Sequence, residues 1–266
     1  MPFTHNKSVR IHWQERGAGS PILLVMGHRY SSALWYPVLD ALAEKHRVIW
    51  FDNRGTGQTD TVKRFEVSDM ADDGIAVLDA AGVQKAHVFG VSMGGGIVLD
   101  LAVRHPERVT SLIVGCSVCF TSEKPRMPAF MRALYYLPPA VLRALTPKRR
   151  GADSYGSAAP ADAVAHDLEV LAKDPFTVPG VVAQAAAIAR HVQTREAVAA
   201  ISVPSLVIHG DEDTAVPFAY GEELADILPA SRFVHLKGVG HNFLVAAKDE
   251  TLKELIAFLG RVDAAA

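Results

Sequence analysis

The sequence predicts an α/β fold in which helices flank a mainly parallel central sheet. Six short segments are almost entirely apolar and end in turn residues, which is typical of strands that are covered on both faces. Segments with apolar residues at helical spacing lie between these strands. Because strand and helix alternate along the chain, we assign it to the α/β class.

The first predicted strand is residues 9–16, VRIHWQER, where apolar and polar side chains alternate as in a half-buried strand. Gly17 and Gly19 end it, and we expect it at an antiparallel edge of the sheet. The mainly parallel strands are expected in the six apolar segments, namely 21–27 PILLVMG, 46–52 HRVIWFD, 86–90 AHVFG, 110–116 TSLIVGC, 204–210 PSLVIHG and 231–238 SRFVHLKG.

The helices that cover the sheet are expected between these strands. In residues 66–82, Val67, Met70 and Leu78 recur at helical spacing, and Gly82 is placed as a C-terminal stop. The other predicted helices are residues 32–46, 93–105, 217–228 and 249–260.

Residues 118–201 interrupt the alternation of strand and helix. This segment lacks a convincing strand but carries Pro, Ala, Leu and Tyr at helical spacings. We therefore expect a helical cap inserted between two sheet strands, with residues 1–117 and 202–266 forming the core. The insertion depends on the flanking strands too much to be called an independent domain.

Charge and hydropathy narrow the class of partner. The 266-residue chain carries 27 Lys and Arg against 29 Asp and Glu, so it has no basic excess to neutralise the phosphates of a nucleic acid. No stretch approaches the roughly 20 apolar residues of a membrane span, and the start lacks a signal-peptide core. We expect a cytoplasmic protein that binds a small-molecule substrate, with neither nucleic acid nor membrane as partner. The sequence leaves the oligomeric state unknown.

Cys116 and Cys119 form a C-x-x-C sequence, which could be a redox pair or half of a zinc site. A zinc site needs two more ligands at suitable spacing, which are absent, and a redox pair usually opens a helix rather than closing a strand. Two buried thiols at the end of a strand are the favoured interpretation. With no metal-ligand cluster and no nucleotide-binding loop in the sequence, we predict no metal and no cofactor.

Residues 86–98, AHVFGVSMGGGIV, place one serine among glycines. Where a strand turns directly into a helix, the residue at the turn adopts a strained backbone and its side chain stands above the sheet. Gly90 and Gly94, two residues before and after Ser92, lack the Cβ atoms that would collide there. A tight turn with an ordinary serine is the alternative. A phosphate-binding loop is excluded, because neither Lys-Ser/Thr nor G-x-G-x-x-G is present.

A nucleophilic serine needs a base and an acid that orients the base. Among eleven histidines, His241 follows the last strand in a glycine-flanked loop, at the sheet edge where active sites of open α/β folds gather. Asp211, Glu212 and Asp213 follow the preceding strand, and only one can face the base. We choose Asp213 because it lies deeper in the loop, with Asp211 as the main rival.

Four further motifs accompany GVSMGGG along almost the whole chain: FDNRGTGQTD, LAVRHPERVTSLIV, HGDEDTAVP and GVGH. Together they resemble the α/β-hydrolase fold superfamily, in its cap-bearing serine esterase, lactonase and haloperoxidase-like branch. The resemblance implies Ser92 as nucleophile, Asp213 as acid and His241 as base. The assignment made from the residues alone is the same.

One position departs from the family pattern. Many relatives carry His-Gly after the third strand, whereas this chain reads LLVMGHRYSSALW, with Met26 in place of the histidine. We expect the backbone N–H groups of His28 and Met93 to form the oxyanion hole, since backbone donation does not depend on the side chain. The His28 side chain could hold a polar part of the substrate or cap the loop outside the pocket.

These residues predict acyl transfer through a covalent intermediate. We expect a hydrolase of a carboxylic ester or lactone that acts on a small, hydrophobic substrate. The expected pocket residues are His28, Tyr30, Phe130, Leu134 and Tyr135. A carbon–carbon bond hydrolase or a cofactor-free perhydrolase would use the same triad. A ligand receptor that retains the triad without turnover is the alternative from another class.

Overall fold

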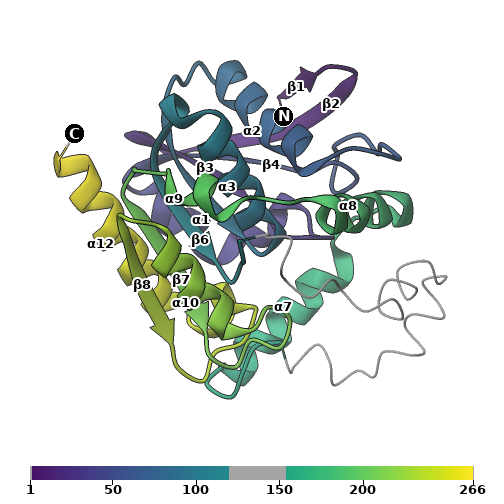
Figure 1. Ribbon diagram of the computed structural model, residues 1–266. Helices are drawn as coiled ribbons and strands as arrows, with labels where there is room; N and C mark the ends of the chain where they lie inside the picture. Colours follow the sequence, from purple (N-terminus) through teal and green to yellow (C-terminus); the bar gives the residue numbers. More distant parts are fainter. Residues whose placement is uncertain (1, 120–153, 266) are drawn as a thin grey trace.

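The computed structural model describes residues 2–119 and 154–265, and its central feature is a twisted sheet (Figure 1). Eight strands form this sheet in the order β1-β2-β4-β3-β5-β6-β7-β8. The strands are β1 Phe3–Asn6, β2 Val9–Arg16, β3 Ser20–Val25, β4 His46–Phe51, β5 Ala86–Val91, β6 Val109–Gly115, β7 Ser205–Gly210 and β8 Ser231–Leu236.

The pairing of the strands confirms a mainly parallel sheet. All neighbours from β4 to β8 are parallel, and each of the six apolar segments overlaps one of these strands. The pairs β1–β2 and β2–β4 are antiparallel. At the antiparallel edge the outermost strand is β1, which the sequence did not indicate because four residues are too few for a periodic signal. The segment expected at the edge, β2, is therefore second from it.

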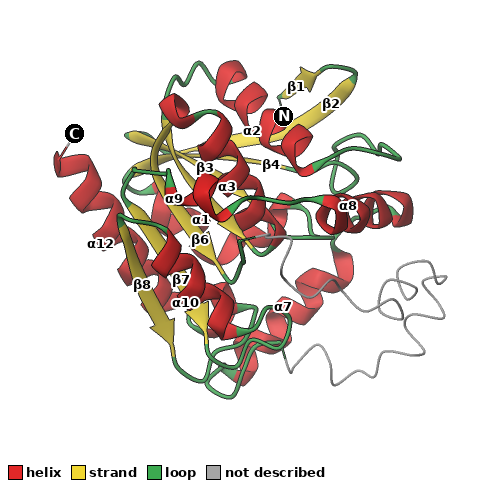
Figure 2. Cartoon of the chain, viewed as in Figure 1, coloured by secondary structure: helices red, strands yellow, loops and turns green. Residues whose placement is uncertain are grey.

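Helices cover both faces of the sheet (Figure 2). One apolar core lies under α2, α3 and α10 and includes Met70 and Leu99, and the other lies under α1, α11 and α12 and includes Leu42 and Phe258. The helices of these layers are α1 Tyr36–Ala43, α2 Val67–Ala80, α3 Met93–Arg104, α10 Phe218–Ile227, α11 Phe243–Ala246 and α12 Lys248–Ala265. Short 3₁₀ helices, Ser32–Trp35 and Pro106–Arg108, precede α1 and β6.

The strand register brings the loops of the functional residues to one edge of the sheet. Val91 at the end of β5 pairs with Gly115 at the end of β6, and Gly115 pairs with Ile208 near the end of β7. On the other side of β5, Gly90 pairs with Val25, the last residue of β3. Because these strands are parallel and end together, the chain leaves each of them at the same edge.

The described part of the insertion between β6 and β7 is helical. It contains α7 Ala161–Lys173, α8 Val178–Arg190 and α9 Arg195–Ala199. The limits of the cap at residues 118–201 remain a prediction, since residues 120–153 lie outside the described chain. Within residues 2–119 and 154–265, every helix is too short or too polar to cross a bilayer.

Candidate active site

Ser92 occupies the turn between β5 and α3. Its backbone has φ +55° and ψ −121°, a conformation that costs a non-glycine residue roughly 1–3 kcal/mol. The flanking glycines make room for it: a Cβ atom at Gly90 would lie 2.1 Å from the carbonyl oxygen of Gly94, and one at Gly94 would lie 2.0 Å from that of Val25. Any larger residue at either position would therefore collide with the backbone. The turn raises the side chain of Ser92 above the sheet edge.

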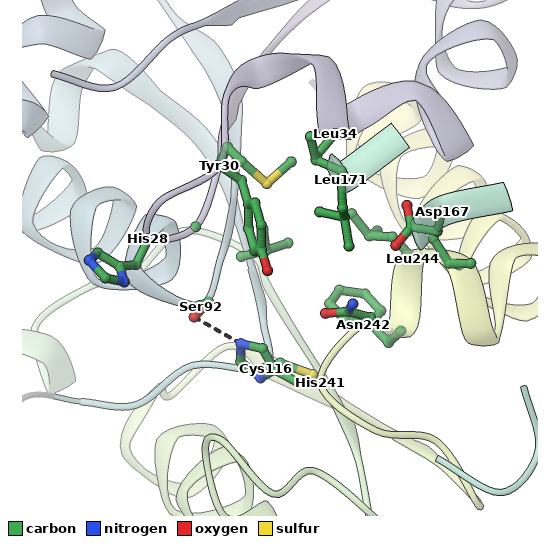
Figure 3. A pocket seen from close by; sticks show the side chains of 15 residues that line it. His28, Tyr30, Leu34, Ser92, Cys116, Asp167, Leu171, His241, Asn242 and Leu244 are labelled. Atoms are coloured by element: carbon green, nitrogen blue, oxygen red, sulfur yellow. Dashed lines mark hydrogen bonds between the residues drawn. The ribbon is translucent and has the colours of Figure 1, made fainter. Parts of the chain in front are cut away.

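The structure brings Ser92, His241 and Asp213 together from three separate loops. His241 Nε2 lies 3.0 Å from Ser92 Oγ, and His241 Nδ1 lies 2.7 Å from Asp213 Oδ2 (Figure 3). The other carboxylate oxygen of Asp213 accepts the backbone N–H groups of Ala215 and Val216, both at 2.8 Å. An ionised Asp213 fixes the imidazole so that Nδ1 carries a proton and Nε2 can accept one from the serine.

The two candidate acids are in different environments. Burial by itself would raise the pKa of Asp213, but hydrogen bonds from His209 and His241 and the charge of His241 outweigh it and hold this pKa far below its usual range. Asp211 lies at the surface, where its carboxylate contacts His235 Nε2 at 2.9 Å and accepts the Gly238 N–H at 2.7 Å. Of the two aspartates, Asp213 is the one in contact with His241.

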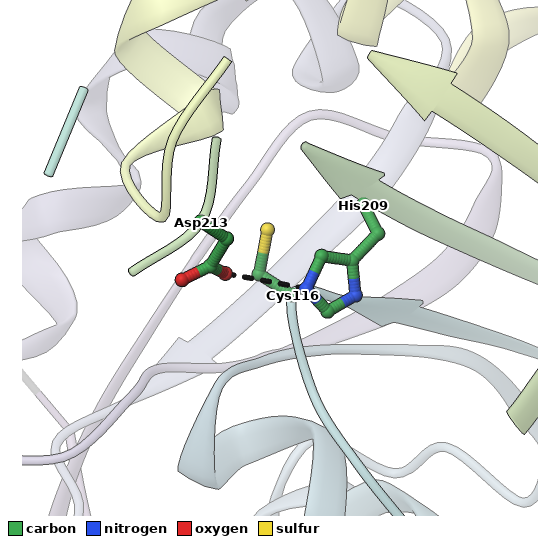
Figure 4. A group of neighbouring side chains, drawn as sticks. All are labelled: Cys116, His209 and Asp213. Carbon is green, nitrogen blue, oxygen red and sulfur yellow. Dashed lines mark ion pairs between the residues drawn. The ribbon is translucent and has the colours of Figure 1, made fainter. Parts of the chain in front are cut away.

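Two further buried side chains, His209 and Cys116, contact Asp213 (Figure 4), and neither was predicted as a site residue. His209 Nε2 lies 3.3 Å from Asp213 Oδ2 and 2.9 Å from the carbonyl oxygen of Val216. A carbonyl can only accept, so this nitrogen carries the proton and donates. Cys116 also hydrogen-bonds with Asp213. The motif HGDEDTAVP contains His209, but nothing in the sequence of this strand indicates that the His209 side chain faces Asp213.

The same three residues are a candidate metal centre, because one ligand atom from each of Cys116, His209 and Asp213 lies within 4.8 Å of the others. Metal binding would require a thiolate and an unprotonated imidazole nitrogen. Burial, with the charge of Asp213, raises the pKa of the Cys116 thiol well above its usual value, and His209 uses its Nε2 proton as a donor. The cluster is better suited to holding the carboxylate of Asp213 than to holding a metal. Cys116 and Cys119 are both buried, and no disulfide joins them.

The loop after β3 lies directly against the serine. A Cβ atom at Gly27 would sit 3.2 Å from Ser92 Cβ, so the backbone that leads to the N–H of His28 passes beside the serine. Met93 is the first residue of α3, where backbone N–H groups lack partners within the helix. The His28 ring borders the pocket, but its Nε2 lies 3.0 Å from the carbonyl oxygen of Val181 in α8. Burial lowers the pKa of His28, which favours the neutral ring.

A pocket that is partly open to solvent lies beside Ser92 and His241, and its empty space, with the adjoining solvent included, is about 600 Å³. Apolar side chains from the sheet edge, α7 and α11 form most of its wall, including Leu34, Leu171 and Leu244. Of the pocket residues that the sequence predicted, His28 and Tyr30 line it, whereas Phe130, Leu134 and Tyr135 lie outside the described residues.

Asp167 and Asn242 also line the pocket and were not predicted. A signal for Asp167 was present in the sequence. Val164, Asp167 and Leu171 lie at helical spacing in one segment, so the carboxylate falls on the same face as two apolar side chains. A charged residue on a buried helix face is an exception that indicates a functional or buried polar role.

Comparison with known proteins gives matches that span most of the chain. Residues 20–247 match the model of a protein family described as having the alpha/beta hydrolase fold. A protein from Azorhizobium caulinodans named "Putative carbamate hydrolase RutD" is 30% identical over 275 residues, which cover 99% of this chain and all of that protein. A pimeloyl-(acyl-carrier protein) methyl ester esterase from Aliivibrio fischeri is 26% identical over 267 residues, covering 94% of this chain and 98% of the esterase.

A solved structure shares the same fold at lower sequence identity. The enol-lactonase from Burkholderia xenovorans superimposes with a TM-score of 0.84 at 23% identity, covering 97% of this chain and 100% of the lactonase. At this identity the likeness establishes the arrangement of helices and strands.

Proposed function

The chain belongs to the α/β-hydrolase fold family, and on that premise we propose that it is a serine hydrolase that cleaves a carboxylic ester or lactone through an acyl-enzyme. The observation that carries the proposal is the continuous hydrogen-bond path from Ser92 Oγ through His241 to Asp213. A serine hydroxyl is a weak nucleophile at neutral pH, and this path supplies both the base and the group that orients the base. The matched relatives are hydrolases by name.

In the proposed reaction, Ser92 Oγ attacks the substrate carbonyl while His241 Nε2 accepts the serine proton. Asp213 stabilises the resulting imidazolium, which then gives the proton to the departing alcohol oxygen. Water enters, loses a proton to His241 and releases the acid from Ser92. The backbone N–H groups of His28 and Met93 hold the oxyanion in both halves of the reaction, and each such donor contributes about 3 kcal/mol to the transition state.

The apolar wall of the pocket supports a small hydrophobic substrate. We assign residues 1–117 and 202–266 to the catalytic core and residues 118–201 to a cap, since Asp167 and Leu171 of α7 border the pocket from the inserted segment. A carbamate is a second candidate substrate, because the Azorhizobium caulinodans protein that matches 99% of this chain is named as a hydrolase of that class. Its carbonyl would meet the same nucleophile and the same oxyanion donors.

Intact-mass analysis after treatment with a serine-directed fluorophosphonate tests the nucleophile without assuming a substrate. We expect one adduct on the native protein and none on Ser92→Ala or His241→Ala. Ser68→Ala, which removes a hydroxyl from α2 outside the pocket, is the matched control and should label like the native protein. A folded native protein that forms no adduct would refute the proposal and favour the receptor alternative.

A panel of esters, lactones and carbamates then identifies the bond that is cleaved. Product analysis by mass spectrometry separates these classes from carbon–carbon cleavage, which would leave a shortened carbon skeleton. Peracid formation from a carboxylic acid and hydrogen peroxide would instead indicate a perhydrolase.

A further inference from the structure

Asp167 is a buried carboxylate in the wall of the pocket. It lies on α7, is 2% exposed, and borders the same pocket as Ser92 and His241. Figure 3 shows it on the opposite side of the pocket from Ser92, beside Leu171 and Leu244, with Tyr30 and Asn242 between the two. The proposed catalytic steps do not use this carboxylate.

Two tyrosine hydroxyls donate to Asp167. Tyr36 Oη lies 2.9 Å from Oδ1, and Tyr155 Oη lies 2.5 Å from Oδ2. Burial and the hydrogen bond to Asp167 raise the pKa of both tyrosines, so the two hydroxyls stay protonated as donors. Each carboxylate oxygen can accept a second hydrogen bond, because an ionised carboxylate has about four acceptor sites.

The negative charge of Asp167 has no cationic partner in the described part of the chain. No Lys, Arg or His of residues 2–119 and 154–265 forms an ion pair with it. The guanidinium of Arg29 lies over the rings of Tyr30 and Phe176, at 5.7 and 5.0 Å from the ring centres. A buried carboxylate is costly unless a positive charge or several hydrogen bonds compensate it, and in the described part of the chain the donors to Asp167 are the two tyrosine hydroxyls.

We propose that Asp167 is a specificity-determining residue that binds a cationic nitrogen of the substrate. The proposal rests on the proposed function and names the substrate class of the same site: an ester, lactone or carbamate whose reacting carbonyl is joined by an apolar linker to an ammonium group. The carbonyl lies at Ser92, the linker lies against Leu171 and Leu244, and the ammonium donates to the free acceptor sites of Asp167. The apolar side chains around Asp167 strengthen the pairing, because they reduce the contact of the two charges with water.

The first test compares esters that differ by one charge. For p-nitrophenyl ω-aminoalkanoates of increasing chain length, each has a neutral partner in which methyl replaces the ammonium. For the native protein we expect kcat/KM to favour the ammonium ester at the length that spans the pocket. In Asp167→Asn this preference, the ratio of kcat/KM for the ammonium ester to kcat/KM for its neutral partner, should fall by about 10- to 100-fold, the usual effect of losing a hydrogen bond to a charged group.

Two control variants separate charge recognition from a structural role. Asp162→Asn removes an exposed carboxylate from the same helix and should keep the preference for ammonium. Tyr155→Phe removes one donor but leaves the charge of Asp167, so it should also keep the preference. If Asp167 served only to hold the tyrosines, Asp167→Asn and Tyr155→Phe would lower both ester rates alike and leave their ratio unchanged, which would overturn the proposal.

A binding measurement keeps the test independent of catalysis. Calorimetry on Ser92→Ala should find tighter binding of an n-alkylammonium ion than of the n-alkanol of equal length, and Asp167→Asn in the same background should abolish the difference. Equal binding of the two ligands would overturn the proposal even if the native protein cleaves esters. Conversely, absence of fluorophosphonate labelling together with selective ammonium binding would reject only the proposed hydrolase activity.

Discussion

Gly94→Ala tests whether the glycines around Ser92 are required by close packing. An added Cβ at this position would lie 2.0 Å from the carbonyl oxygen of Val25 and 2.8 Å from that of Met26. Real Cβ atoms essentially never lie within 3.0 Å of such an atom, so α3 or the end of β3 must move. Overpacking of this kind costs about 1–3 kcal/mol or more, and alanine returns about 1 kcal/mol through its better helix propensity. A clash of 2.0 Å with a backbone atom belongs at the upper end of the overpacking range, so we expect a net loss of about 2 kcal/mol or more.

Gly260→Ala is the matched control, because nothing lies within 4 Å of a Cβ atom at Gly260 in the middle of α12. It should gain about 0.5–1 kcal/mol from helix propensity alone, so the two variants should differ by about 2.5–3 kcal/mol or more. Urea denaturation measures both free energies of unfolding, and the rate of fluorophosphonate labelling reports on Ser92. Gly94→Ala must also label more slowly, since the moved backbone carries the proposed oxyanion donors. Equal stability and equal labelling of Gly94→Ala and the native protein would refute the reasoning.

Three further predictions concern the charged and titratable groups. Asp213→Asn should lower kcat on any cleaved ester by about 10,000-fold, because the amide no longer fixes the proton on His241 Nδ1. Asp211→Asn should keep a nearly native kcat. Similar losses of kcat in both variants would contradict the assignment of Asp213 as the acid. His28→Ala retains its backbone N–H and should lower kcat by less than about tenfold, so a larger loss would mean that the ring itself takes part in turnover. Burial lowers the pKa of His191 in the folded chain to about 4, from an ordinary value of 6.5. Between these two pH values the unfolded chain binds a proton that the folded chain does not, so the free energy of unfolding falls as the pH drops. Urea denaturation at these two pH values should find that the free energy of unfolding of His191→Asn falls by about 2–3 kcal/mol less than that of the native protein. A pH dependence equal to that of the native protein would contradict this prediction.

The fold and the contacts of Ser92 could be predicted from the sequence because each requires a local sequence pattern. A parallel strand that is buried on both faces must be apolar throughout, so β5 and β7 could be recognised from six-residue segments. The strained turn requires glycine near Ser92, and the strand order then places the loop of His241 at the same edge. The choice of Asp213 over Asp211 had a weaker basis, since both follow β7 and only the direction of the loop separates them.

The remaining features depend on contacts between distant segments, which leave little trace in the sequence. His209 is a strand residue like many others, and its contact with Asp213 depends on how the following loop turns back over β7. Asp167 meets Tyr36 across 131 positions of the chain, so neither residue alone indicates the pair. The predicted pocket residues Phe130, Leu134 and Tyr135 lie outside the described residues and stay a prediction.

The inserted segment also holds the loop that carries the proposed oxyanion donor. Arg29 has a left-handed backbone, φ +79°, and its N–H donates to Gln184 Oε1 of α8 at 2.8 Å. The next contact along the loop is the N–H of Ser31, which donates to Asp174 Oδ2 at 2.9 Å. Such a conformation persists in a non-glycine residue only when its surroundings fix it.

If both proposals hold, these contacts link substrate selection to catalysis. The segment between β6 and β7 supplies Asp167 to the pocket wall and, through Gln184 and Asp174, fixes the backbone that leads from His28 to Ser31. A change in the position of α7 or α8 would therefore alter both the pocket and the direction of the His28 N–H. Substitutions that shift α7 or α8 should consequently change kcat together with KM, rather than KM alone, because the proposed oxyanion donor acts in the transition state.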